Sequence, residues 1–231
     1  MGVRFHAHAD PDALTRAVAA VLAKRCDAGV AERGHAWLAL AGGRTPLPIY
    51  ARLAASKRPG RLDVVPTDDR CVAHDHPASN VRELRAAFTA TRDAQVHALT
   101  CADGDIQASL MQARALLSAH PAPFDAVLLG MGADGHIASL FPGDANLAAG
   151  LALDSGQEVI ATLPDPLPPQ APFARISLTL PRLLRAHSVL LAITGQDKRA
   201  MLERAWHARD SSLPIAALLR AGLPIDVHWS P

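Results

Sequence analysis

A histidine at position 136 follows a glycine-rich segment at the end of a predicted buried strand. The strand covers residues 124–129 (FDAVLL), and the segment GMGADGH (130–136) comes directly after it. Imidazole is the side chain best suited to accept a proton near neutral pH, and a helical turn beginning at His136 would keep the ring neutral through its dipole. A surface histidine that caps a turn is the alternative. The position among glycines after a strand favours a catalytic base, with Asp134 beside it.

The same segment matches the GxGxxG pattern of dinucleotide-binding folds, but its surroundings do not. Asp154 stands about 20 residues further on, where such folds place the carboxylate that binds ribose. A dinucleotide-binding fold also needs an uninterrupted helix after the glycines, and Pro142 and Gly143 interrupt it here. The match also lies mid-chain rather than in a first βαβ unit. We therefore predict that no dinucleotide or other cofactor is bound.

A second glycine-rich turn joins a predicted strand over residues 36–41 to a predicted helix. Its sequence is AGGRTP, with Gly42 and Gly43 followed by Arg44 and Thr45. Glycines let backbone N–H groups approach an anion, and a helix N-terminus adds a favourable dipole. The GK[ST] ending of a Walker A loop is missing. The turn is either a phosphate site to which Arg44 and Thr45 add donors, or a plain strand-to-helix turn in which Thr45 caps the helix.

Two carboxylates and an arginine follow the predicted strand over residues 62–67. Asp68 and Arg70 at this strand end suggest a polar site, whereas a solvated loop with a local ion pair is the alternative. A few residues on, His74 and His76 have a spacing that suits a metal ion. No third ligand stands at a telling spacing, so we predict no metal site.

A lysine and an arginine in the last third of the chain are candidate anion ligands. Lys198 is one of only three lysines among 23 basic residues, and it falls in the first turn of a predicted helix over residues 196–208. A cation there is disfavoured by the helix dipole, and an anionic ligand would remove the conflict. Arg175 opens a predicted strand over residues 175–180. We predict that Lys198 binds phosphate.

Strands and helices alternate along the chain, which predicts an α/β fold with a mostly parallel sheet covered by helices on both faces. Ligands in such sheets bind beyond the carboxyl ends of the strands. We expect residues 1–231 to form a single domain, with a proline-rich lid or connector between residues 164 and 172. The predicted strands cover residues 36–41, 62–67, 95–99, 124–129, 158–163, 175–180, 187–194 and 225–229; the predicted helices cover residues 10–28, 45 onwards, 77–90, 103–119 and 196–208.

Composition limits the classes of partner. The net charge of +1, without long runs of like charge, argues against nucleic acid. No apolar stretch reaches the roughly 18 residues of a membrane span, and the N-terminal region has no signal-like apolar segment. Three widely spaced cysteines without a CxxC motif fit unpaired thiols in a reducing compartment. We expect a cytoplasmic protein; the sequence leaves its oligomeric state open.

Four segments together resemble the 6-phosphogluconolactonase family, within the wider group that includes glucosamine-6-phosphate deaminases. They are AGGRTP (41–46), DDRCVAHDHPASN (68–80), LLGMGADGHIASLFPG (128–143) and SLTLPRLLRAHSVLLAITGQDKRAML (177–202). The resemblance implies a modified Rossmann-like, doubly wound sheet without a dinucleotide. It implies substrate or phosphate binding by Gly42, Gly43, Arg44, Thr45, Gly132, Arg175 and Lys198. Among these, it places the phosphate itself near Gly43, Arg44, Thr45, Arg175 and Lys198. It places the lactone near Asp68, Arg70, Asp134 and His136.

The chain departs from the family pattern at several positions. Ala41 and Arg44 replace small serines of the glycine loop, Asp69 replaces a glutamate, Ala73 a proline and Ile137 a threonine. Arg44 bears on how phosphate is held, and none of the changes removes the histidine.

The resemblance implies hydrolysis of 6-phospho-D-glucono-1,5-lactone to 6-phosphogluconate, the second step of the oxidative pentose phosphate pathway. His136 is then the base that activates water, and the glycine-loop N–H groups or Arg70 stabilise the oxyanion. The orienting roles of Asp68 and Asp134 stay open. Deamination of glucosamine 6-phosphate is an alternative, although its branch carries a glutamate after the DGH motif that this chain lacks. A non-catalytic sugar-phosphate sensor is another.

Overall fold

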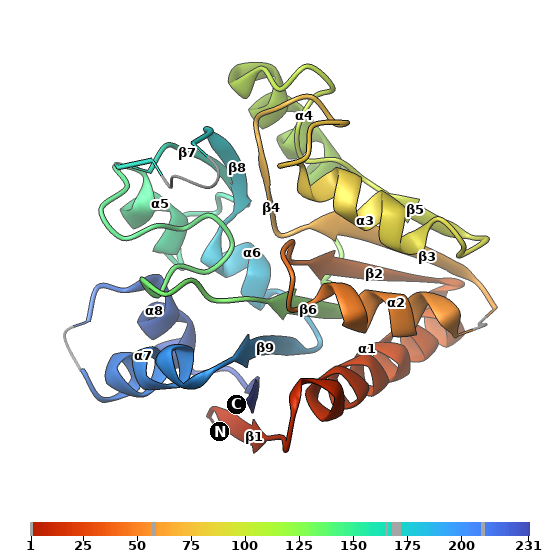
Figure 1. The fold of residues 1–231 in the computed structure, drawn as a ribbon. Helices are drawn as coiled ribbons and strands as arrows, with labels where there is room; N and C mark the ends of the chain where they lie inside the picture. Colours follow the sequence, from red (N-terminus) through yellow and green to blue (C-terminus); the bar gives the residue numbers. More distant parts are fainter. Residues whose placement is uncertain (1, 57–58, 165, 168–171, 209–210) are drawn as a thin grey trace.

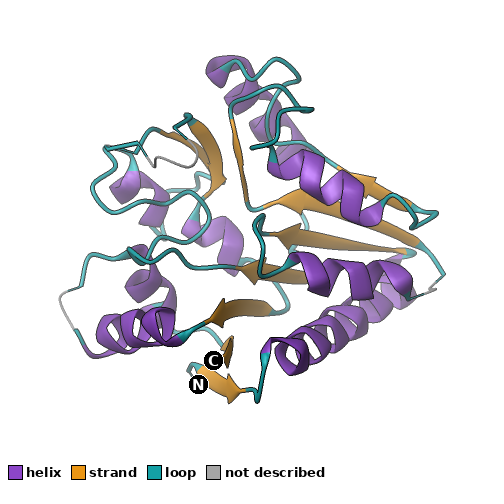
Figure 2. Cartoon of the chain, viewed as in Figure 1, coloured by secondary structure: helices purple, strands orange, loops and turns teal. Residues whose placement is uncertain are grey.

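The computed structural model describes residues 2–56, 59–164, 166–167, 172–208 and 211–231 (Figure 1). Helices and strands alternate along most of this length (Figure 2). The strands are β1 (Arg4–Ala7), β2 (His35–Leu40), β3 (Arg61–Pro66), β4 (Asp68–Arg70), β5 (Ala94–Val96), β6 (Ala126–Leu129), β7 (Val159–Thr162), β8 (Arg175–Leu178), β9 (Val189–Thr194) and β10 (Ile225–Ser230). The helices are α1 (Pro11–Arg33), α2 (Leu47–Ala55), α3 (Asn80–Phe88), α4 (Ile106–Ala119), α5 (Leu147–Leu151), α6 (Leu180–Leu184), α7 (Gln196–His207) and α8 (Pro214–Arg220).

The main sheet of the described residues has seven strands in the order β1-β10-β9-β6-β2-β3-β5, and each neighbouring pair is parallel. From β2 the chain builds outward through β3 and β5. From β6 it builds the other way through β9 and β10. The direction of strand order therefore reverses between β2 and β6, and a reversal of this kind opens a crevice at the carboxyl ends of the two strands.

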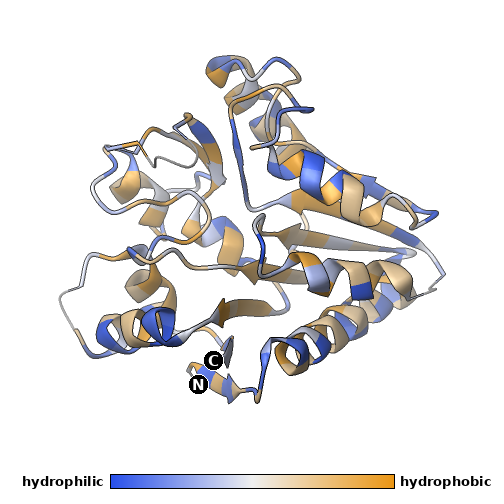
Figure 3. Cartoon of the chain, viewed as in Figure 1, coloured by the Kyte–Doolittle hydropathy of each residue, from blue (hydrophilic) through white to orange (hydrophobic). Residues whose placement is uncertain are grey.

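Alternating side chains of the buried strands supply two cores, one on each face of the main sheet. On β2, Leu38 and Leu40 belong to a core with α1, α2 and α3. Trp37 and Ala39 belong to the other core, with α4, α6, α7 and α8. The central strands β6 and β9 carry mostly hydrophobic colours, and hydrophilic patches lie on α3 and α7 (Figure 3). The predicted doubly wound α/β fold is confirmed.

A second, three-stranded sheet in the order β4-β8-β7 was not predicted. Its strands pair antiparallel, so the segments predicted as strands over residues 158–163 and 175–180 stand outside the parallel sheet. The short strand Asp68–Arg70 pairs with Arg175–Leu178, which brings two of the predicted polar groups side by side. The proline-rich segment connects the paired strands β7 and β8; Pro168 and Pro169 in it lie outside the described residues.

Several helix boundaries differ from the prediction, since α3 and α4 each begin three residues later than the predicted 77 and 103, and α1 and α2 differ as well. Helix α1 begins where Asp10 and Pro11 predict, but it continues to Arg33 and ends at Gly34, which has a φ of 76°. The prediction that Thr45 caps α2 is wrong, because the helix begins at Leu47 and residues 44–46 form a turn. Thr45 is thereby left in the loop. None of the described helices is both long and apolar enough to cross a membrane.

A buried carboxylate ties the end of α1 to the central strands. Asp125 is 3% exposed; its Oδ2 accepts a hydrogen bond from the backbone N–H of Trp37 at 2.8 Å, and its Oδ1 accepts one from Arg33 at 2.5 Å. A Cβ at Gly29 would lie 2.6 Å from this carboxylate, so only glycine lets α1 pass over it. Asp125 therefore holds α1 against β2 just before β6 begins.

We predict that Asp125→Ala lowers the free energy of unfolding by about 2–3 kcal/mol, since it leaves the Trp37 N–H buried without an acceptor. Urea unfolding followed by circular dichroism measures the change. Glu203→Ala, which removes an exposed pair with Arg199 on α7, is the control and should cost no more than about 0.5 kcal/mol. Equal unfolding midpoints for Asp125→Ala and the wild type would contradict the role of Asp125.

Candidate active site

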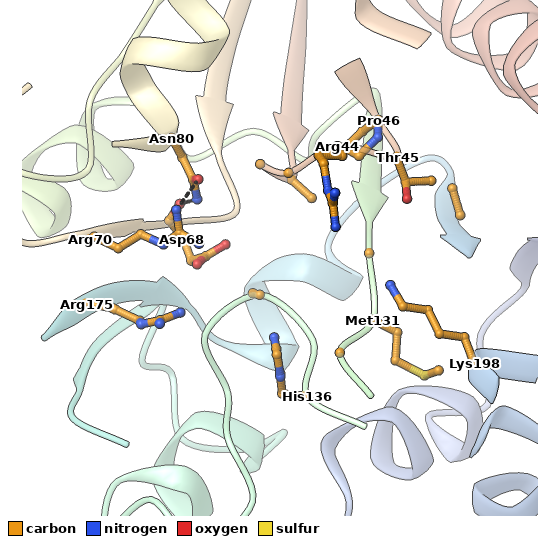
Figure 4. A pocket seen from close by; sticks show the side chains of 17 residues that line it. Arg44, Thr45, Pro46, Asp68, Arg70, Asn80, Met131, His136, Arg175 and Lys198 are labelled. Carbon is orange, nitrogen blue, oxygen red and sulfur yellow. Dashed lines mark hydrogen bonds between the residues drawn. The ribbon is translucent and has the colours of Figure 1, made fainter. Parts of the chain in front are cut away.

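A pocket of about 260 Å³ opens at the carboxyl ends of β2, β6 and β9, where the strand order reverses, and β4 and β8 of the small sheet form its opposite wall (Figure 4). Ten of the eleven predicted site residues line it. These are Gly42, Gly43, Arg44, Thr45, Asp68, Arg70, Gly132, His136, Arg175 and Lys198. The eleventh, Asp134, is hydrogen-bonded to His136. The chemistry was expected to follow the strands, and the two glycine turns do so after β2 and β6. Arg175 instead opens β8, and Asp68 and Arg70 lie within β4 of the small sheet.

The loop after β6 folds back on itself to present His136. The backbone N–H of Gly132 donates to the His136 carbonyl at 3.0 Å, and the N–H of Gly135 donates to the Gly132 carbonyl at 3.1 Å. A Cβ at Gly132 would lie 2.2 Å from the His136 ring and 2.6 Å from Asp134 Oδ1. Only glycine at position 132 leaves room for this arrangement.

No helical turn begins at His136, so the condition under which a helix dipole would keep its ring neutral is not met. The turn formed by Gly132–Gly135 continues into a short bridge between Ile137 and Leu140 instead. What fixes the ring is a side chain. His136 Nδ1 lies 2.6 Å from Asp134 Oδ1, and the ring packs on Phe141 with centroids 4.2 Å apart.

The Asp134 carboxylate determines which nitrogen of His136 is protonated. Partial burial raises the pKa of Asp134, but the hydrogen bond and charge of His136 outweigh it, and the pKa is lowered overall. An ionised carboxylate only accepts hydrogen bonds, so Nδ1 of His136 is the donor. In the neutral ring, Nε2 then carries the lone pair. In Figure 4 the ring extends into the pocket.

Asp68 and Arg70 are held by Asn80, the first residue of α3. The Asn80 amide Nδ2 donates to the Asp68 carbonyl at 2.7 Å, and its Oδ1 accepts from Arg70 Nη1 at 3.1 Å. Arg70 Nη1 also donates to the Ala78 carbonyl at 2.7 Å. A Cβ at Gly42 would lie 2.1 Å from Asn80 Oδ1. Asn80 therefore packs directly on the glycine turn after β2 and joins it to β4.

Asp69 points away from the pocket and anchors the start of α3. Its carboxylate accepts backbone hydrogen bonds from Arg70 at 2.8 Å, Asn80 at 2.6 Å and Val81 at 3.1 Å. Burial raises the pKa of Asp69 despite these three donors. This aspartate positions the loop and does not line the pocket.

Arg175 and Lys198 lie on opposite sides of His136 (Figure 4). Arg175 is buried next to Asp68; burial lowers its pKa, and the charge of Asp68 opposes the change. Lys198, in the first turn of α7, lies near Arg44: burial lowers the pKa of Lys198, and the positive charge of Arg44 lowers it further. The pocket thus has one end with opposite charges and one end with two cations.

Sequence reasoning missed Asn80 and Ser139, whose contacts shape the site. From the sequence, Asn80 was identified only as part of the polar segment after Arg70. Its position directly after Ser79, which caps α3, is the signal that could have identified it as a site residue. Ser139, whose hydroxyl donates to Asp68, is fully buried and had no such signal. Within the ranges that the structure describes, no group of three or more histidine, cysteine or acidic residues is placed to hold a metal ion.

Comparison with known proteins identifies the lineage. A family model described as glucosamine-6-phosphate isomerases/6-phosphogluconolactonase matches residues 9–229. A 6-phosphogluconolactonase of Pseudomonas putida is 35% identical, over 99% of this chain and 93% of the relative. The crystal structure of a 6-phosphogluconolactonase from Shewanella baltica has a TM-score of 0.89 at 31% identity, covering 99% of this chain and 98% of that chain.

A monomeric glucosamine-6-phosphate deaminase also superposes on this chain. Its TM-score is 0.78 at 20% identity, and the match covers 100% of this chain and 97% of that chain. A likeness at this identity shows the shared fold alone. The fold therefore does not separate hydrolysis from deamination, and the side chains in the pocket must do so.

We predict that Arg44→Ala raises the pKa of Lys198, because it removes a like charge from the same end of the pocket. The chain has three lysines, so an NMR titration after ¹³C-dimethylation can follow each one. Arg114→Ala on α4, away from the pocket, is the control and leaves the Lys198 titration unchanged. An unchanged Lys198 titration in Arg44→Ala would show that the two cations do not interact.

Proposed function

Because this chain belongs to the family of glucosamine-6-phosphate isomerases and 6-phosphogluconolactonases, we propose that it hydrolyses 6-phospho-D-glucono-1,5-lactone to 6-phosphogluconate. This is the second step of the oxidative pentose phosphate pathway. The observation that carries the proposal is the pairing of His136 with Asp134 in a pocket whose other end holds two cations. A δ-lactone with a phosphate needs both parts: a base at the carbonyl and positive charge at the phosphate.

His136 is the proposed base. Its Nδ1–H is engaged by Asp134, so Nε2 is the nitrogen that can take a proton from water. The water oxygen bonds to the lactone carbonyl carbon, and the carbonyl oxygen becomes an oxyanion. When the bond from that carbon to the ring oxygen breaks, the imidazolium returns the proton to the ring oxygen. The new carboxylic acid loses its own proton to solvent.

Arg70 is the proposed partner of the oxyanion. Arg175, which the resemblance assigns to the phosphate, lies near Asp68 and across His136 from Lys198, so its positive charge is assigned here to the oxyanion instead. The Arg70 guanidinium is fixed by the Ala78 carbonyl and Asn80, so it needs little rearrangement to meet the developing charge. The glycine turn is a weaker candidate, because the N–H of Gly43 already donates to Glu83 Oε2 at 3.1 Å. The Asp68 carboxylate at this end suits the sugar hydroxyls as an acceptor.

Arg44, Thr45 and Lys198 are the proposed phosphate ligands. A dianion between Arg44 and Lys198 would cancel the repulsion between the two cations and the mismatch of Lys198 with the dipole of α7. Gly42 and Gly43 shape the turn that carries Arg44 and Thr45: Gly42 makes room for Asn80, and Gly43 has a φ of 98°. Gly132 makes room for His136 in the way that Gly42 makes room for Asn80.

The alternative activity within the family is deamination of glucosamine 6-phosphate. The resemblance associates it with a glutamate after the phenylalanine of the DGH segment, whereas this chain has Ser139-Leu140-Phe141-Pro142. An ammonia-release assay with glucosamine 6-phosphate should therefore give no signal. The substrate class, a sugar phosphate, together with the lack of a CxxC motif among the three cysteines, favours the cytoplasm as the place of reaction.

We predict that His136→Ala lowers kcat about 10²-fold or more on freshly generated 6-phosphogluconolactone, after correction for spontaneous hydrolysis. His207→Ala, which changes an exposed histidine at the end of α7, is the matched control and keeps the wild-type rate. Near-normal turnover by His136→Ala would remove this residue from the mechanism. A folded wild-type protein with no rate above background would remove the lactonase proposal.

We predict that Lys198→Ala raises KM for the phosphorylated lactone about tenfold or more, the scale of one lost charge-assisted hydrogen bond. Its kcat/KM on glucono-1,5-lactone, which has no phosphate, stays at the wild-type value. Initial-rate kinetics on the two substrates test the split. Equal losses on both would place Lys198 at the reacting carbonyl instead.

A further inference from the structure

Ser139 contacts two charged groups of the pocket although it does not line the pocket itself. It is 0% exposed. Its Oγ donates to Asp68 Oδ2 at 2.5 Å and accepts from Arg175 Nη1 at 3.4 Å. A hydroxyl has one proton to give and lone pairs to receive, so it satisfies a carboxylate and a guanidinium at the same time. The Ser139 hydroxyl therefore lies between two buried groups of opposite charge.

The backbone is constrained to put Ser139 there. Residues 137–140 form a tight turn in which the Leu140 N–H donates to the Ile137 carbonyl at 2.9 Å, and Ala138 has a φ of 48°. An alanine in the left-handed region is strained, and such strain persists only where the surroundings hold it. Here the Ser139 N–H donates to Ser177 Oγ on β8 at 3.1 Å. The turn is thus fixed to the strand that carries Arg175.

Opposite charges attract strongly where burial excludes water. Asp68 and Arg175 are 6% and 4% exposed, and they are the carboxylate and one of the guanidiniums at the lactone end. Thr67 Oγ1 donates to the other oxygen of Asp68 at 3.1 Å, so both carboxylate oxygens have a hydroxyl donor. The guanidinium of Arg175 also lies over the Phe141 ring, 4.7 Å from its centroid, and the Ser139 hydroxyl stands between the guanidinium and the carboxylate.

We propose that Ser139 is a positioning residue for the hydrolysis proposed above: it keeps Asp68 and Arg175 apart so that both face the substrate. The Ser139 hydroxyl takes the place of a direct ion pair between Asp68 and Arg175. In such a pair, each charged group would be neutralised by the other and would interact less with the substrate. Because Ser139 acts at the lactone end, it affects the reacting ring and leaves phosphate binding by Arg44 and Lys198 as it is.

The test is Ser139→Ala, with Ser188→Ala as the control for loss of another buried serine hydroxyl. In Ser139→Ala we expect kcat/KM to fall about 10- to 100-fold, the range for one hydrogen bond to a charged group, on both 6-phosphogluconolactone and glucono-1,5-lactone. Inhibition by inorganic phosphate stays unchanged, as does the activity of Ser188→Ala. Adding Ser139→Ala to Asp68→Asn causes little further loss, because residues that act as a unit are not additive.

Several outcomes would overturn the proposal. An active wild type with an equally active Ser139→Ala contradicts it, as do additive losses in the double variant. Parallel weakening of phosphate inhibition would instead mean a general collapse of the pocket. If Ser139→Ala does not fold by circular dichroism, Ser139→Cys keeps the volume with a weak donor and must show the same pattern. A folded wild-type protein without lactonase activity would contradict the proposed function itself. The outcomes above contradict only the role of Ser139, because they require an active wild type.

Discussion

The reversal of strand order between β2 and β6 is the constraint on which the site depends. Parallel strands all end at one edge of the sheet, but neighbouring connections usually cover that edge. Where one connection turns toward β3 and the next toward β9, the loops after β2 and β6 separate and leave a crevice. Both loops are rich in glycine, because each must let a side chain pack on its backbone: Asn80 on Gly42, and His136 on Gly132.

A crevice at the edge of a parallel sheet has one wall, and the small antiparallel sheet supplies the other. β4 and β8 bring Asp68, Arg70 and Arg175 opposite the glycine loops. The register of the pair places Arg70 directly across from Arg175. Two guanidiniums side by side repel each other, and the Asp68 carboxylate close by makes the arrangement tolerable. The small sheet therefore determines the electrostatics of the pocket end formed by Asp68, Arg70 and Arg175.

Local sequence predicted β2, β3, β5, β6, β9 and β10 of the parallel sheet, but not the edge strand β1. It also singled out the glycine turns, His136 and Lys198 of the candidate site. Strands such as 124–129 and turns such as 41–46 have short-range signals, and Lys198 conflicts visibly with its helix dipole. The antiparallel pairing of β4 with β8 was not predictable in this way, because it joins segments about 100 residues apart whose residue types fit either sheet. The predicted start of α2 was wrong for a related reason. Thr45 is a residue type that often caps helices, but here it lies in the turn before the helix, which begins at Leu47.

Arg175 and Arg182 are both buried, and the sequence alone does not show that they have different surroundings. Arg182 stacks on Phe124 at 3.7 Å and faces Glu158 and the Ala122 carbonyl, so its charge is met within the fold. Arg175 donates to the Ser139 hydroxyl, which in turn donates to Asp68, and it lines the pocket. In sequence the two arginines look alike; their surroundings in the fold place Arg182 in the core and Arg175 at the pocket. At the other end of the pocket, the charge of Arg44 lowers the pKa of Lys198. An anion bound between these two cations would relieve their repulsion, and this gain would add to the free energy of binding.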